Sequence, residues 1–348
     1  MSPPVRLSRA ATRGLGIAAA LGVSLIVLAI AEASVLEAWL LGFILLAGLS
    51  AGAVAMLLTG HILGETWLQP IRAELEAVAD LMPMVAVLAV PVLAFPQALY
   101  RWVGGDTAAA DRDWLDAEFF VIRGVIYLAI WIAIAHLAKL RHYSRMASGI
   151  GLVVLVPSIS LAALDWLASR EPEWISGLYG PAFTVSQLLA AMSFALLVTL
   201  IRPGHPGRIE VESLRTALLA LALLTLWTWY SQFLIVWMAD LPPESAWYLG
   251  RAGPWLVLQY IAVPALLIAI VLLVPPHAGP ARLVTITGLL LVQHLAHLIW
   301  LVRPTALHAV PAVVDIAVLA GLIGLWLLFL SVDLTRRPNL AVDDKAGA

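Results

Sequence analysis

Arg123 and Asp165 are the two residues whose types and positions most clearly suggest chemistry. Each lies inside a long apolar stretch, where an ionisable side chain is costly and is therefore a candidate for function. The two stretches follow one another along the chain, and both residues lie near the same end. We expect a bidentate contact between the guanidinium and the carboxylate, because each charge offsets the other's desolvation.

Three roles are open for this pair. The ion pair would fix the register of two helices, the Asp165 carboxylate would accept protons, or the Arg123 guanidinium would anchor a quinone or an anion. Several other polar residues of the apolar stretches lie near the same end: Gln97, Gln187, Gln232, Gln259, His297 and Asp315. One end of the molecule is therefore predicted to be the polar end.

The histidines do not form a convincing metal or haem site. His294 and His297 share a helix face, but no carboxylate accompanies them on that stretch. His61 and His136 match in depth, but near the opposite end. We expect buried or interfacial histidines and no metal bound by this chain. The sequence also has no nucleotide-binding glycine loop, HExxH or GxSxG motif.

The elements that position these residues are predicted to be membrane-spanning helices. The chain is 62% hydrophobic and 12% charged, whereas roughly a quarter of the residues of a soluble domain are charged. Ten stretches approach the roughly 20 apolar residues that a spanning helix needs. They are Leu15–Ala31, Ala38–Leu58, Leu81–Tyr100, Phe119–Leu140, Ser148–Leu167, Gly180–Ile201, Leu214–Met238, Pro254–Val274, Leu283–Val302 and Pro311–Val332. This pattern predicts an all-α polytopic membrane protein, with residues 1–348 forming a single integral membrane domain.

Basic residues indicate the orientation of these spans. If the helices alternate in direction, most basic residues fall on one side of the membrane: Arg6, Arg9, Arg13, Arg72, Lys139, Arg141, Arg145, Arg202, Arg208, Arg215, Arg282, Arg336, Arg337 and Lys345. The other side receives Arg101, Arg112, Arg170, Arg251 and Arg303. The positive-inside rule then predicts that both termini are cytoplasmic and that the polar end faces outward. Trp174, Tyr179, Trp247, Tyr248 and Trp255 in the outer connections are typical of an interfacial aromatic belt.

The chain has no cysteine. This excludes disulfides, thiolate-held iron–sulfur clusters, covalently attached c-type haem and thiol catalysis within it. If electrons pass near this chain, a partner carries them. No basic patch argues for nucleic acid binding.

Three segments of the chain resemble a known membrane subunit. Leu164–Trp166 (LDW) and Glu171–Gly180 (EPEWISGLYG) are similar to the LDW…EPxWxSxxYG signature of the ActF-like subunit of alternative complex III, a quinol:cytochrome c oxidoreductase. Ser231–Trp237 (SQFLIVW), with the LPPE and WY motifs that follow it, and Phe119–Tyr127 (FFVIRGVIY) also resemble that subunit. The subunit is similar to the NrfD or polysulfide-reductase-like superfamily.

The resemblance implies an architecture and a set of partners. It implies two four-helix bundles, spans two to five and six to nine, flanked by the first and last helices. The implied partners are a paralogous NrfD-like membrane subunit, and iron–sulfur and c-type cytochrome subunits on the periplasmic face of the bacterial inner membrane. No cofactor is expected in this chain, although contact with quinone or quinol is compatible with the family.

The resemblance also suggests roles for individual residues. Asp165 would relay a proton, Arg123 would act on it through its charge, and Glu171 would pass the proton to water. Tyr179 and Gln232 would hydrogen-bond a quinone carbonyl or a bridging water. The leading expectation is a non-catalytic, structural and proton-conducting membrane subunit. A secondary transporter and a pure membrane anchor for periplasmic redox subunits are the alternatives.

Overall fold

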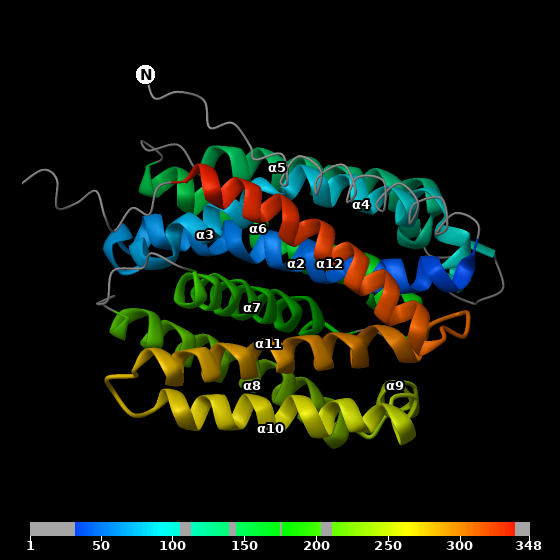
Figure 1. The fold of residues 1–348 in the computed structure, drawn as a ribbon. Helices are drawn as coiled ribbons and strands as arrows, with labels where there is room; N and C mark the ends of the chain where they lie inside the picture. Colours follow the sequence, from blue (N-terminus) through cyan, green and yellow to red (C-terminus); the bar gives the residue numbers. More distant parts are fainter. Residues whose placement is uncertain (1–31, 105–112, 139–143, 175, 203–210, 338–348) are drawn as a thin grey trace, which may run out of the picture.

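The computed structural model describes residues 32–104, 113–138, 144–174, 176–202 and 211–337. Within these ranges the chain is all-helical and has no strand, as the sequence predicts. The predicted first span, Leu15–Ala31, lies outside the described residues. Long helices run side by side along one axis of the molecule (Figure 1).

Nine helical segments of the described ranges are long and apolar enough to cross a membrane. They are α2 (Ala33–Leu63), α3 (Gln69–Asp80) together with α4 (Met82–Ala94), α5 (Ala117–Ala138), α6 (Arg145–Trp166), α7 (Tyr179–Ile201), α8 (Glu212–Ala239), α10 (Leu256–Leu273), α11 (Pro280–Val302) and α12 (Ala312–Arg336). The short helix α9 (Pro242–Leu249) connects α8 to α10. The segments correspond to predicted spans two to ten, and they give the chain the architecture of a multi-pass membrane protein.

The third predicted span differs from the observed helix at both ends. The helical segment begins at Gln69, because α3 precedes α4 with only Leu81 between them. Its expected continuation to Tyr100 is wrong, since α4 ends at Ala94. The cause is Pro96, which disfavours helical backbone at the preceding Phe95; that residue has φ −126° and ψ 51°. The polar stretch before the span therefore extends the helix, and the stretch after it does not.

Helix α2 is the centre of the molecule. Every residue from Leu36 to Leu58 is buried. Helices α3, α4, α5 and α6 pack on it from one side, α7 packs from the other, and α12 lies across it (Figure 1). Beyond α7, α8 and α11 pack on α7, and α10 packs on both α8 and α11. A spanning helix that is apolar all round is expected in such a central position.

The close approach of α2 and α7 depends on glycine. A Cβ atom on Gly52 would collide with the backbone carbonyl of Gln187, and one on Gly48 would collide with the Gln187 side chain. Small residues at such crossings bring two backbones close enough for extensive van der Waals contact. The glycine spacing in α2 therefore shapes the centre of the bundle.

We expect the substitution Gly52→Ala to destabilise the protein by about 1–3 kcal/mol, because a backbone carbonyl cannot move aside as a side chain can. Gly288→Ala is the matched control, since a Cβ at that position in α11 meets nothing within 4 Å. Alanine is also the better helix former, so the control should be neutral or slightly stabilising. Thermal unfolding in detergent would compare the two variants. Equal melting temperatures would contradict the close-approach explanation.

Candidate functional site

The polar end of the bundle is the end at which α2, α5, α7, α10 and α12 begin and α4, α6, α8 and α11 finish. Four arginines that are each at most 5% exposed lie there. Each forms an ion pair with a carboxylate, and we call the four pairs the arginine layer. The pairs are Arg123–Asp165, Arg170–Glu37, Arg251–Glu171 and Arg303–Asp315.

Asp165 and Arg123 form the predicted bidentate contact. The Arg123 Nε atom donates to Asp165 Oδ2 at 2.8 Å, and Nη2 donates to Oδ1 at 2.9 Å. The Tyr127 hydroxyl donates to Oδ2 at 2.9 Å, and the Trp114 indole nitrogen donates to Oδ1 at 2.9 Å. The guanidinium also lies over the Trp114 ring at 4.0 Å and the Phe119 ring at 4.2 Å. Hydrogen bonds therefore hold the carboxylate, and aromatic rings contact the guanidinium.

This geometry favours a structural role, in which the ion pair holds α5 and α6 rigidly together; we call this the lock explanation. A carboxylate has about four acceptor positions, and each Asp165 oxygen already accepts two hydrogen bonds. An incoming proton would have to displace one of these donors. Tyr127 could have been found from the sequence, because it stands four residues after Arg123 on the same helix face. Trp114 comes from the connection before α5, where no periodic pattern predicts its direction.

Glu171 belongs to a different pair from Asp165. Its Oε2 atom lies 2.6 Å from Nη2 of Arg251, a residue between α9 and α10. The Arg251 guanidinium lies 3.6 Å from the centre of the Trp247 ring, and its Nη1 donates to the Trp247 carbonyl at 2.9 Å. Of the three residues predicted to form a proton relay, Arg123 and Asp165 form one pair of the arginine layer, and Glu171 belongs to another.

Tyr179 belongs to an aromatic cluster that also contains Trp174, Trp229 and Trp247. The Trp174 and Trp247 rings stack at 4.5 Å, and the Tyr179 ring packs edge-on against Trp174 at 5.4 Å. The Gln232 side-chain oxygen accepts a hydrogen bond from the Ser176 hydroxyl. Because Trp174, Tyr179 and Trp247 are at most 5% exposed, the interfacial-belt interpretation is wrong for these three. They pack the connections of the polar end against one another.

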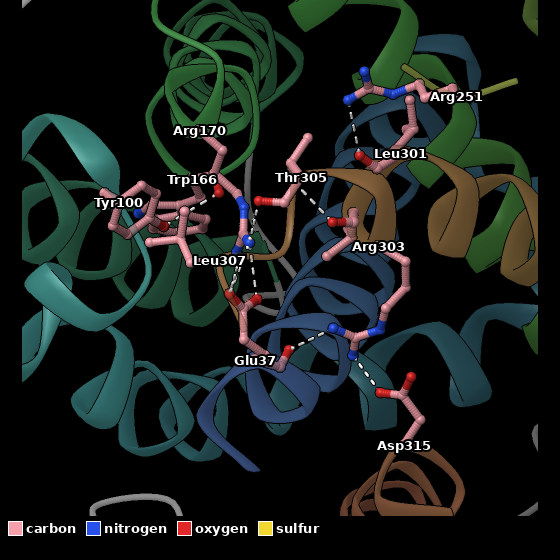
Figure 2. A network of polar contacts seen from close by, with 11 residues as sticks. Glu37, Tyr100, Trp166, Arg170, Arg251, Leu301, Arg303, Thr305, Leu307 and Asp315 are labelled. Atoms are coloured by element: carbon pink, nitrogen blue, oxygen red, sulfur yellow. Dashed lines mark hydrogen bonds and ion pairs between the residues drawn. The ribbon is translucent and has the colours of Figure 1, made fainter. Parts of the chain in front are cut away.

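Glu37 is a further residue that the sequence reasoning missed. It is fully buried at the start of α2, and its oxygens accept hydrogen bonds from Arg170 Nη2 at 3.0 and 2.8 Å. Its Oε1 also accepts one from the Leu307 backbone N–H at 2.8 Å. Figure 2 shows how Arg170 then reaches the Thr305 carbonyl, to which it donates at 2.8 Å. One carboxylate therefore ties α2 to the α6–α7 and α11–α12 connections.

Arg303 extends this network towards α12. It donates to the Glu37 backbone carbonyl at 3.2 Å and to the Asp315 carboxylate (Figure 2). On the other side, the Tyr100 hydroxyl donates to the Trp166 carbonyl at 3.2 Å. Burial raises the pKa of Tyr100 above its usual value, so the hydroxyl stays protonated and remains a donor. Hydrogen bonds and ion pairs thereby connect the polar end from the segment after α4 to α12.

The structure gives no sign of a metal centre in the described ranges, where no three His, Asp or Glu side chains come close enough to share an ion. His61 contacts the Ser148 hydroxyl, with 3.2 Å between Nδ1 and Oγ. His297 contacts Gln259 and lines a cavity, which is described below. No residue set among those described is therefore assigned to a metal.

Fold and site together define a class: an all-helical, multi-pass membrane protein whose helices are held at one end by buried arginine–carboxylate pairs. Comparison of the chain with models of known protein families, and with curated proteins, gives no match.

Proposed function

We propose that this chain is a membrane subunit of a quinol-oxidising electron-transfer complex, of the type of alternative complex III. In this proposal the chain is structural, and partner subunits carry the electrons. One observation carries the proposal: the segments on which the sequence resemblance depends come together at the polar end. Residues that build a docking platform for extramembrane partners need to be contiguous in this way.

The contacts between these segments are specific. Asp165 in the LDW segment pairs with Arg123 in the Phe119–Tyr127 segment. Trp174 and Ser176 in the Glu171–Gly180 segment contact Trp247 and Gln232, which belong to the third segment. Sequence motifs separated by up to about a hundred residues thus lie together at the polar end. Such convergence supports a common role for the motifs.

The proposed orientation follows from charge. The positive-inside rule assigns both termini to the cytoplasm and the arginine layer to the periplasmic side of a bacterial inner membrane. Iron–sulfur and c-type cytochrome subunits would then dock on the connections of the polar end, and a paralogous membrane subunit would pack beside the helices. Helices α2 to α6 and α7 to α11 would form the two four-helix bundles of the family. Because the sequence has no cysteine, thiolate-held clusters and attached haem belong to the partners.

Within this proposal the arginine layer mainly gives rigidity. A platform that aligns redox centres must hold its connections in one position, and buried bidentate pairs do so at the cost of desolvating charge. Proton relay through Asp165, and quinone contact by Tyr179 and Gln232, are additional hypotheses. The saturated hydrogen bonding of Asp165 makes its relay role the weaker of the two.

Affinity purification from the native membrane in mild detergent tests this proposal. We expect haem-stained bands of c-type cytochromes, iron–sulfur subunits and a second multi-pass homologue to co-purify with the chain. Mass spectrometry would identify each band. A chain that purified alone would contradict the proposal, and uptake assays in liposomes would then test the secondary transporter as the alternative.

A further inference from the structure

A cavity of about 350 Å³ lies between α8, α10 and α11, in the half of the bundle nearer the polar end. Its volume is within the range of roughly 300–1,000 Å³ that is usual for small-molecule sites. Most of the lining is apolar, and the aromatic walls include Trp229, Tyr248 and Trp300. Neither Tyr179 nor Gln232 lines it. The cavity is therefore separate from Tyr179 and Gln232, although Phe233 and Tyr248 of the third resembling segment are part of its lining.

The mouth of the cavity opens between α8 and α10. Three lining residues are strongly exposed: Tyr230 and Phe233 on α8, at 58% and 45%, and Val263 on α10, at 44%. Both helices belong to the set that is long and apolar enough to span a membrane. The surface around this mouth is one that lipid would cover. A molecule that enters here would come from the bilayer.

One residue that lines the cavity, His297, carries a donor that has no partner among the described residues. The Gln259 amide nitrogen lies 3.1 Å from Nδ1 of His297. An amide nitrogen donates, so Nδ1 accepts, and the neutral imidazole carries its proton on Nε2. This Nε2 atom is buried and has no hydrogen-bond partner among the described residues. A buried N–H without an acceptor is rare in proteins, and an acceptor on a bound ligand would satisfy it.

The rings around His297 define the shape of that ligand. The Trp229 ring lies 4.5 Å from the imidazole at 63°, and the Trp300 ring lies 5.5 Å from it at 29°. Aromatic walls of this kind favour a flat apolar group that can stack or pack edge-on. The single unpaired N–H favours one carbonyl oxygen on that group.

We propose that this cavity binds a membrane-soluble molecule with a flat apolar ring that bears a carbonyl oxygen. The carbonyl accepts a hydrogen bond from His297 Nε2, Gln259 fixes the imidazole tautomer, and Trp229 and Trp300 contact the ring. An apolar tail leaves through the mouth between α8 and α10. This site deepens the proposed function, on which it rests, because a quinone is one such ligand. Its test is independent, since the isolated chain would bind the ligand without a redox partner.

Equilibrium binding to the full-length chain in phosphatidylcholine nanodiscs tests the site. The probe is a 1,4-naphthoquinone with a decyl tail, and decylnaphthalene is the same shape without carbonyl groups. We expect saturable naphthoquinone binding that is at least about tenfold weaker in His297→Phe. His294→Phe is the matched control, because His294 is equally buried on α11 but does not line the cavity. It should bind the probe as the native chain does.

A second variant keeps the test decisive if His297→Phe fails to fold. Ala262→Phe fills the cavity from α10 and leaves His297 unchanged. It should abolish probe binding, while the melting temperature stays near that of the native chain. Two results would overturn the proposal. One is the absence of saturable binding to the native chain, and the other is decylnaphthalene binding as tightly as the naphthoquinone.

Discussion

Replacing Arg170 with methionine should lower the free energy of unfolding by about 3–5 kcal/mol, because it would leave the Glu37 carboxylate buried and unpaired. The Arg170 side chain is 1% exposed and that of Glu37 is 0% exposed, so water cannot replace the lost partner. The same change removes the hydrogen bond to the Thr305 carbonyl and loosens the α11–α12 connection. Unfolding in detergent, followed by circular dichroism, would measure the effect.

The double variant Glu37→Gln/Arg170→Met separates charge from packing. Glutamine keeps an oxygen for the Leu307 backbone N–H, and methionine fills part of the arginine's volume, so the double variant should recover most of the lost stability. Arg215→Met is a control at the opposite end, because the Glu212 carboxylate that it leaves behind is 42% exposed and stays hydrated. A pair with a hydrated partner contributes less. If Arg215→Met were as damaging as Arg170→Met, the explanation from burial would be wrong.

Asp165→Asn should destabilise the protein by about 3 kcal/mol, because the new amide nitrogen would face two of the four donors that now point at the carboxylate. The guanidinium of Arg123 would also stay buried without a counter-charge. Both the melting temperature and the quinol-dependent rate per assembled complex would be measured. A lock predicts loss of stability with a nearly unchanged rate in those complexes that still assemble.

The relay hypothesis predicts the opposite result for the same variant. A complex that assembled normally, but released protons or transferred electrons slowly, would make Asp165 a proton carrier. Glu171→Gln adds an independent comparison, because Glu171 is 33% exposed and pairs with a different arginine. Under the relay hypothesis both variants should lower the rate of proton release. Under the lock explanation only Asp165→Asn should have a large effect on stability.

Hydropathy predicted the helices well, and their ends less well. The apolar stretches from α2 to α12 are long enough that each could be assigned without knowing its neighbours. The end of α4 was misjudged, because the run of apolar residues continues past Ala94 while the backbone turns at Phe95. Hydropathy places the end of this helix after Ala94, whereas the effect of Pro96 on Phe95 places it at Ala94. The helix ends where the proline requires.

The site was predictable only where depth in the membrane limited the choices. Arg123 and Asp165 lie on consecutive spans at matching depth, so their contact followed from topology. The Glu37–Arg170 pair joins residues 133 positions apart, and Glu37 stands at a helix start, where a charge is ordinarily solvated. The contact between Gln259 and His297 depends on how α10 packs on α11. Pairings of this kind arise from tertiary packing, which no local pattern encodes.

Deletion of the gene is the sharpest test of the proposal that this chain is the membrane platform for redox subunits. The measurement is the amount of c-type haem and iron–sulfur protein that stays in washed membranes, together with quinol-dependent cytochrome reduction. We predict that both fall to background without the chain and return when the native chain is restored. Full retention of the redox subunits and an unchanged rate in the deletion membranes would contradict the claim.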